Sequence, residues 1–153
     1  MNPTHFYDSA SPENVPSGVY AAVYINGDFR WPEDEIRRMS KVFGVSVEKE
    51  PSWARLARCI DLENGAGGIE DAAPFIKARL HYGFDDGTVY VNRSNRDEVA
   101  GRLQGAGITA LNWVATLDGT MDVLDAWAVQ YHGGLNAPFD LSVLHGVNNF
   151  HKP

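Results

Sequence analysis

The chain has 153 residues, a length that suits one domain, and 44% of its residues are hydrophobic, which is enough to build a core. The formal net charge is −7, with 13 scattered basic residues against 20 acidic ones, and this balance argues against partners such as nucleic acid or an anionic membrane. The single cysteine, Cys59, excludes an internal disulfide and a multi-cysteine zinc site.

The N-terminal segment 1–14 is polar and has neither the basic start nor the apolar centre of a secretory signal peptide. No apolar run approaches the ~20 residues that span a bilayer. We therefore expect a protein that is made in the cytoplasm without a signal peptide. Association with a virion, or arrival at a cell wall, would need a route independent of such a signal.

Strands and helices are predicted to alternate along the chain. The predicted strands are 5–8, 19–25, 42–47, 56–62, 88–91, 111–115, 126–131 and 139–144. The predicted helices are 32–39, which starts at a proline followed by acids, 69–81, and 96–104. Pro74 is expected to delay or kink the second helix and Gly83 to end it, while Ser94 or Asn95 caps the third.

The order of these elements predicts an α/β fold with a largely parallel sheet. The apolar run 19–25 is typical of a strand that is buried on both faces, as strands of parallel sheets are. About eight strands in one domain, residues 1–153, predict a (β/α)8 barrel of the TIM type. Because that fold usually takes about 250 residues, this barrel must be a reduced one, with several helices short or missing.

Two acids, Asp61 and Glu63, stand at the end of the predicted strand 56–62, just before a glycine-rich turn. Residues two apart on a strand point to the same face, about 6.5 Å from each other along the backbone. Functional sites of parallel α/β folds form at the carboxyl ends of strands. Two neighbouring carboxylates repel, so one becomes easier to protonate while the other stays ionised. Cleavage of a glycosidic bond needs this pairing of an acid with an anion.

Two more acids stand at strand ends: Asp8 closes the first predicted strand and Asp140 begins the last. If the sheet closes into a barrel, all four acids can surround one pit. Aromatic side chains near strand ends can line it, because their faces suit the C–H faces of sugar rings. These aromatic candidates are Tyr24, Tyr90, Trp113 and Tyr131.

Other interpretations of these residues remain open. Acids at strand ends often only cap the loop that follows, and tryptophans are more often core residues than sugar platforms. The four acids also form a donor set that suits a hard cation such as Mg²⁺ or Ca²⁺. The turn Gly65–Gly68 can cradle a phosphate, although it lacks the Lys-Ser/Thr of a P-loop. The histidines near the C-terminus lack metal-ligand spacing, and our prediction includes neither a metal nor a cofactor.

A set of short motifs in a fixed order carries a family resemblance. They are YD at 7–8, YING at 24–27 with WP at 31–32, CIDLENG at 59–65, TVYVNRS at 88–94, NWVA at 112–115, AVQY at 128–131 and FDLS at 139–142. The set resembles the family 25 glycoside hydrolase-like domains of the lysozyme (muramidase) type, and is most similar to their short actinobacterial and actinophage branch. The resemblance spans most of the chain.

The resemblance implies a barrel with reduced helices that cleaves β-1,4 bonds of peptidoglycan or a related amino-sugar polymer. It implies that Glu63 is the general acid and that Asp61 stabilises the transition state, or an intermediate assisted by the acetamido group of the substrate. Asp8 and Asp140 would complete the acidic pit. By the same resemblance, Tyr90, Trp113 and Gln130 would line the sugar site, in addition to the strand-end aromatic candidates Tyr24 and Tyr131.

A barrel of the same fold without turnover is the main alternative. Such a protein would bind glycans, or would serve as a structural module together with other proteins of a phage particle. A hydrolase that uses a metal held by the carboxylates is a third hypothesis.

Overall fold

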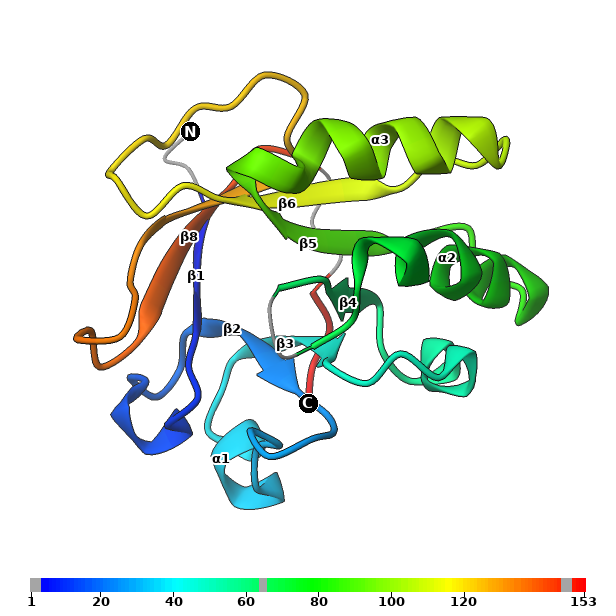
Figure 1. The fold of residues 1–153 in the computed structure, drawn as a ribbon. Coiled ribbons are helices and arrows are strands. Elements are labelled where there is room, and N and C mark those ends of the chain that lie inside the picture. The colour runs from blue at the N-terminus through cyan, green and yellow to red at the C-terminus, as the bar shows by residue number, and fades with distance from the viewer. Residues whose placement is uncertain (1–3, 64–65, 147–149) are drawn as a thin grey trace.

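The computed structural model describes residues 4–63, 66–146 and 150–153, and eight short strands form a closed barrel within them (Figure 1). The strands are β1 (Thr4–Asp8), β2 (Tyr20–Tyr24), β3 (Lys41–Ser46), β4 (Cys59–Asp61), β5 (Thr88–Asn92), β6 (Leu111–Ala115), β7 (Ala128–His132) and β8 (Asp140–Leu144). Each strand pairs with the next along the chain, and β8 pairs with β1. The predicted reduced (β/α)8 barrel is confirmed.

The strands β1 to β7 run parallel, whereas β8 runs antiparallel to both of its neighbours, β7 and β1. Segment 133–139 therefore joins β7 to β8 as a hairpin, with no crossover helix. The reversal brings the start of β8 to the barrel end where the other strands finish. Asp140 consequently lies directly opposite Asp8 in the β1–β8 ladder.

Three α-helices occur within the described residues: α1 (Glu33–Arg37), α2 (Ala72–His81) and α3 (Arg96–Gly105). Figure 1 shows α2 and α3 side by side along β5 and β6. The remaining connections use 3₁₀ turns or irregular segments, which explains how the barrel fits into so short a chain. No helix in this part of the chain has both the length and the apolar character needed to cross a membrane.

Two helix predictions need correction at their first residues. The segment 69–81 begins as a 3₁₀ turn, Ile69–Asp71, and becomes α-helical only at Ala72, so that Pro74 lies in the first helical turn. A proline is tolerated there because its missing N–H has no partner to lose. In α1, Pro32 occupies the N-cap and not the first helical position. Asn95 occupies the N-cap of α3, but its side chain makes no capping hydrogen bond.

The predicted strand 56–62 is mostly wrong, because β4 comprises only Cys59–Asp61. Leu56 ends a 3₁₀ turn, its N–H donating to the carbonyl of Trp53, and its side chain is 70% exposed. The apolar run that suggested a long strand therefore mixes a turn with a strand. Leu80 of α2 is also exposed.

Aromatic side chains fill the barrel interior at the end away from the acids. Phe6 of β1 contacts Trp113, at 5.2 Å between ring centroids, and Phe150, at 5.0 Å. Phe43 of β3 stacks on Trp127 at 5.2 Å. The interior of an eight-stranded barrel is just wide enough to be filled by side chains in this way. The barrel interior at this end is therefore mainly apolar, and the buried side chains of Asp8, Asp61 and Gln130 lie towards the carboxyl ends of the parallel strands.

Outside the barrel, α2 carries a buried arginine that joins three segments. The Nη1 of Arg79 donates to the carbonyls of Ala54 and Ala57, at 3.0 and 2.6 Å, and its Nη2 pairs with Asp86 at 2.5 Å. The side chain is only 3% exposed. These contacts fix the segment that leads into β4, the strand that carries Asp61.

We predict that Arg79→Met destabilises the fold by about 3 kcal/mol, because it removes the donor to the carbonyls of Ala54 and Ala57 and leaves Asp86 with only its ion pair to Arg58. Urea denaturation followed by circular dichroism measures this loss. Arg102→Met is the matched control, because Arg102 forms only an exposed pair with Glu98 on α3. Equal stability of the two variants would contradict the role given to Arg79.

Candidate active site

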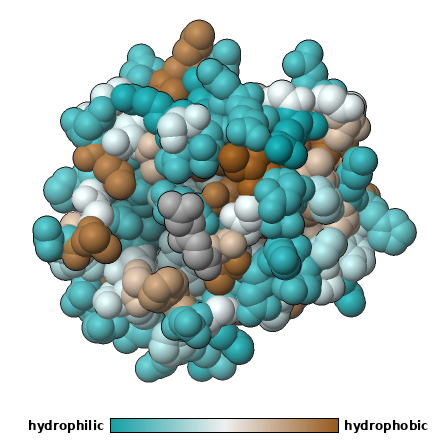
Figure 2. Space-filling view, viewed as in Figure 1, coloured by the Kyte–Doolittle hydropathy of each residue, from teal (hydrophilic) through white to brown (hydrophobic). Residues whose placement is uncertain are grey.

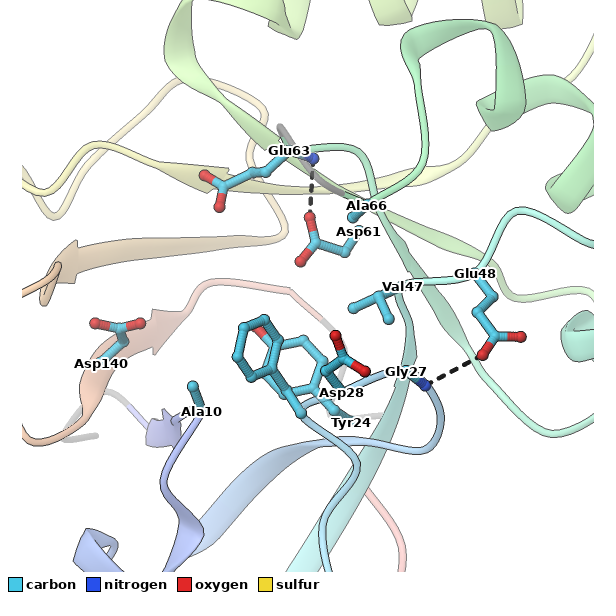
Figure 3. Close-up of a pocket in the computed structure, with 11 residues that line it drawn as sticks. Ala10, Tyr24, Gly27, Asp28, Val47, Glu48, Asp61, Glu63, Ala66 and Asp140 are labelled. Carbon is cyan, nitrogen blue, oxygen red and sulfur yellow. Dashed lines mark hydrogen bonds between the residues drawn. The ribbon is translucent and has the colours of Figure 1, made fainter.

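A cavity of about 380 Å³ opens at the barrel end where the parallel strands finish (Figure 3). Its walls come from the ends of β2, β3 and β4, from the start of β8 and from the loops that follow β1 to β4. The lining residues are Ala10, Tyr24, Gly27, Asp28, Phe29, Val47, Glu48, Asp61, Glu63, Ala66 and Asp140. None of them is basic, so the cavity is lined by carboxylates and apolar groups.

Asp61 is the last residue of β4, and only 6% of its surface is exposed. Burial raises the pKa of its carboxyl group to about 7. The backbone N–H of Glu63, which donates to Asp61 Oδ1 at 2.9 Å, opposes this rise, and the charge of Glu63 adds to it. The backbone of Glu63 thus fixes the position of the Asp61 carboxyl group.

Glu63 lies beyond the end of β4, after the chain has bent. It reaches the cavity through this bend and not through strand alternation, although Asp61 and Glu63 line the same cavity as expected. Burial raises the pKa of the half-buried Glu63, the nearby charge of Asp140 raises it further, and a hydrogen bond with Tyr90 lowers it. Figure 3 shows the carboxyl groups of Asp61, Glu63 and Asp140 around one space.

Asp8 lies beneath the cavity and is almost completely buried. Gln130 Nε2 donates to both of its carboxylate oxygens at 3.1 Å. Burial raises the pKa of Asp8 well above its usual value, and so does the charge of Asp140, to which Asp8 is hydrogen-bonded. Asp140 accepts a hydrogen bond from the Gly134 N–H at 2.8 Å. Burial thus raises the pKa of both carboxyl groups of the Asp8–Asp140 pair.

Three of the predicted sugar-lining residues are buried in the barrel and do not line the cavity. Tyr90, Trp113 and Gln130 are each at most 5% exposed. The Tyr90 hydroxyl donates to Gln130 Oε1 at 2.7 Å, and Gln130 in turn holds Asp8. Trp113 Nε1 donates to Ser142 Oγ at 3.0 Å inside the barrel.

The other two predicted lining residues, Tyr24 and Tyr131, differ in position. Tyr24 lines the cavity from the end of β2. Tyr131 packs against the core outside the barrel, and its hydroxyl is 3.2 Å from Nδ1 of His5 on the outer face of β1. The sheet therefore separates Tyr131 from the acids, because neighbouring residues of a strand face opposite sides.

The structure adds cavity residues that the sequence analysis did not single out. Phe29 is 51% exposed at the rim, with its ring 6.3 Å from that of Tyr24. Glu48 accepts hydrogen bonds from the Gly27 N–H at 3.2 Å and from Trp53 Nε1 at 2.7 Å, which ties two loops together. Glu48 follows β3 closely, so the strand-end rule that found Asp61 would also have found it. No sequence pattern marks Phe29.

The described residues contain no group of three or more His, Cys, Asp or Glu side chains arranged to hold a metal ion. Cys59 is buried inside the barrel, where burial raises the pKa of its thiol. Of the turn considered for phosphate, Gly65 lies outside the described residues.

Comparison with known proteins shows one fold relationship. No protein-family model matches the chain, and no curated protein matches it. Among solved structures, it is similar to the virulence factor GHIP, a glycosyl hydrolase 25 of Streptococcus pneumoniae that participates in host cell invasion. The match has a TM-score of 0.57 at 16% identity and covers 95% of this chain and 88% of the other. The chain therefore has a fold like that of a glycosyl hydrolase 25.

We predict that Asp61→Asn stabilises the protein at pH 8 and has little effect near pH 4. The folded-state pKa of about 7 lies above the ordinary 3.8, so the stabilisation from holding the proton is complete below pH 3.8 and is lost as the pH rises through 7. Asparagine never ionises and keeps the bond from Glu63, which implies a gain on the order of 1 to 3 kcal/mol at pH 8.

Thermal and urea unfolding at the two pH values measure this difference. Asp122→Asn, at an exposed position outside the cavity, is the matched control. It should leave the stability unchanged both at pH 4 and at pH 8. A destabilised Asp61→Asn at pH 8 would show that the Asp61 carboxylate is not under strain from burial.

Proposed function

We propose that this chain is a lysozyme-like glycoside hydrolase that cleaves β-1,4 bonds of peptidoglycan or of a related amino-sugar polymer. The observation that carries the proposal is the gathering of four carboxyl groups, those of Asp8, Asp61, Glu63 and Asp140, at one end of the barrel. The likeness of the fold to a glycosyl hydrolase 25 supports the same reaction class.

In this proposal Glu63 is the general acid. It is the more accessible of the two β4-side carboxyl groups, and its raised pKa keeps a proton available at a higher pH than an ordinary glutamic acid would. A leaving oxygen in the cavity can reach it from the open side, because Glu63 stands on the bend above the barrel. Proton donation to that oxygen weakens the glycosidic bond as it breaks.

Asp61 stabilises the positive charge that develops on the sugar, either directly or by orienting the acetamido group of the substrate. Burial makes its anion costly in the empty cavity, which is why its pKa is about 7. A cation forming beside it relieves that cost. The favourable interaction therefore grows as the transition state forms, which is the condition for an effect on rate and not merely on binding.

Asp8 and Asp140 act as a pair that shares one proton. Asp8 donates from below, so the exposed part of Asp140 remains an acceptor for sugar hydroxyls. Tyr24 and Phe29 offer apolar faces to the sugar ring from the opposite wall. Gln130 holds Asp8 in place and Tyr90 holds Gln130, while Trp113 packs against Tyr90 and Tyr131 takes no part in substrate contact.

The test is the release of reducing ends from purified peptidoglycan by the wild type and by Glu63→Gln. Loss of the general acid should reduce turnover by about 10²–10⁴-fold with the fold intact. Glu98→Gln, on the exposed face of α3, is the matched control and should keep full activity.

A folded wild type that releases no reducing ends from peptidoglycan or from N-acetylglucosamine oligomers would overturn the proposal. Saturable glycan binding without turnover would then support a binding or phage-structural module of the same fold. Activity that disappears with a chelator and returns with Mg²⁺ or Ca²⁺ would instead support a carboxylate-metal hydrolase.

A further inference from the structure

A second hollow of about 380 Å³ adjoins the cavity on the side of β1 and β8. Its walls are the loop after β1, residues 9–14, and the β7–β8 hairpin, residues 134–140. Ala10 and Asp140 line both hollows. The two hollows therefore adjoin at Ala10 and Asp140.

The walls of this second hollow are fixed by side-chain hydrogen bonds. Ser9 Oγ donates to the carbonyl of Pro138 at 3.1 Å, which joins the β1 loop to the hairpin. The carbonyl of Ser9 accepts a bond from the buried Trp31 Nε1 at 2.9 Å. On the hairpin side, the Gly134 N–H holds the Asp140 carboxylate at 2.8 Å. The hollow is therefore a built feature of the folded chain.

The hairpin gives the second hollow an apolar side next to an acid. Leu135 is fully exposed at its lip, although leucine normally avoids water. Ala137, Pro138 and Phe139 continue the apolar surface, and Phe139 is held edge-on by Tyr7 at 5.0 Å between ring centroids. A sugar ring matches such a surface, because it carries apolar C–H faces and hydroxyl groups that bond to a carboxylate.

We infer that this second hollow, which we call the outer subsite, binds a sugar unit that lies beyond the two sugars whose bond is at Asp61 and Glu63. The inference rests on the proposed function and adds a minimum length to the substrate, since an oligosaccharide must pass over Asp140 to fill both hollows. Because the two hollows adjoin at Ala10 and Asp140, the occupant that we infer is the same glycan chain. Each hollow lies within the size range of small-molecule sites, about 300–1,000 Å³.

The test uses N-acetylglucosamine oligomers from the disaccharide to the hexasaccharide. In the wild type, kcat/KM should rise with length until the outer subsite is filled. Leu135→Ala removes apolar contact and Ala137→Trp fills the hollow, so each should lower kcat/KM for the long oligomers by about tenfold and leave the disaccharide unaffected. Leu124→Ala is the matched control, because Leu124 is 79% exposed and lines neither hollow.

Binding to Glu63→Gln, followed by NMR chemical shifts, separates this inference from the proposed function. Shifts of the Leu135 and Ala137 amides with long but not short oligomers support the outer subsite, whether or not the wild type hydrolyses them. Hydrolysis that is independent of length and insensitive to both variants overturns the outer subsite alone. Length-dependent binding with these shifts but without hydrolysis overturns the proposed catalysis alone, and the absence of both binding and hydrolysis overturns both.

Discussion

The carboxyl pair of Asp8 and Asp140, facing each other across the β1–β8 ladder, is the contact on which the site depends. It exists only because β8 runs against its neighbours. A parallel β8 would have put Asp140 at the opposite end of the barrel, far from Asp61 and Glu63. The hairpin that reverses the chain also supplies the N–H that holds Asp140 and the apolar side of the second hollow. One change of strand direction thus creates both the acidic site and its extension.

The packed interior sets the electrostatics of the acids above it. Phe6, Phe43 and Trp113 leave little room for water beneath Asp8 and Asp61, and burial is accordingly the largest cause of the raised pKa of both carboxyl groups. Two buried polar residues accompany these acids. Gln130 donates a hydrogen bond to Asp8, and Tyr90 donates one to Gln130. Burial of ionisable groups therefore costs stability at this end of the barrel.

Much of the fold could be predicted from the sequence, because eight apolar runs separated by turns leave few alternatives to a closed sheet. The position of Asp61 followed from the same rule, since strand ends gather at one edge of a barrel. The direction of β8 could not be predicted, because an apolar run does not show whether its strand will pair in a parallel or an antiparallel way. The side on which Tyr131 lies depends on the alternation within β7, which one shifted boundary reverses. The route of Glu63 into the cavity depends on a bend after β4, where the Leu62 N–H donates to the Tyr90 carbonyl and the Gly67 N–H donates to the Asp61 carbonyl, and the sequence does not reveal these contacts.

The ladder between β1 and β8 has a consequence for how the chain reaches its folded state. Thr4 pairs with Leu144, so the first strand has its second partner only when almost the whole chain is present. Contacts of such long sequence separation form slowly, because the ends of a long loop must meet before they are stabilised. During synthesis the edge of β1 therefore stays unpaired, and the aromatic interior behind it stays uncovered, until β8 has been made. The parallel strands and α2–α3 can associate earlier, so closure by β8 is the step at which the acidic site first comes into existence.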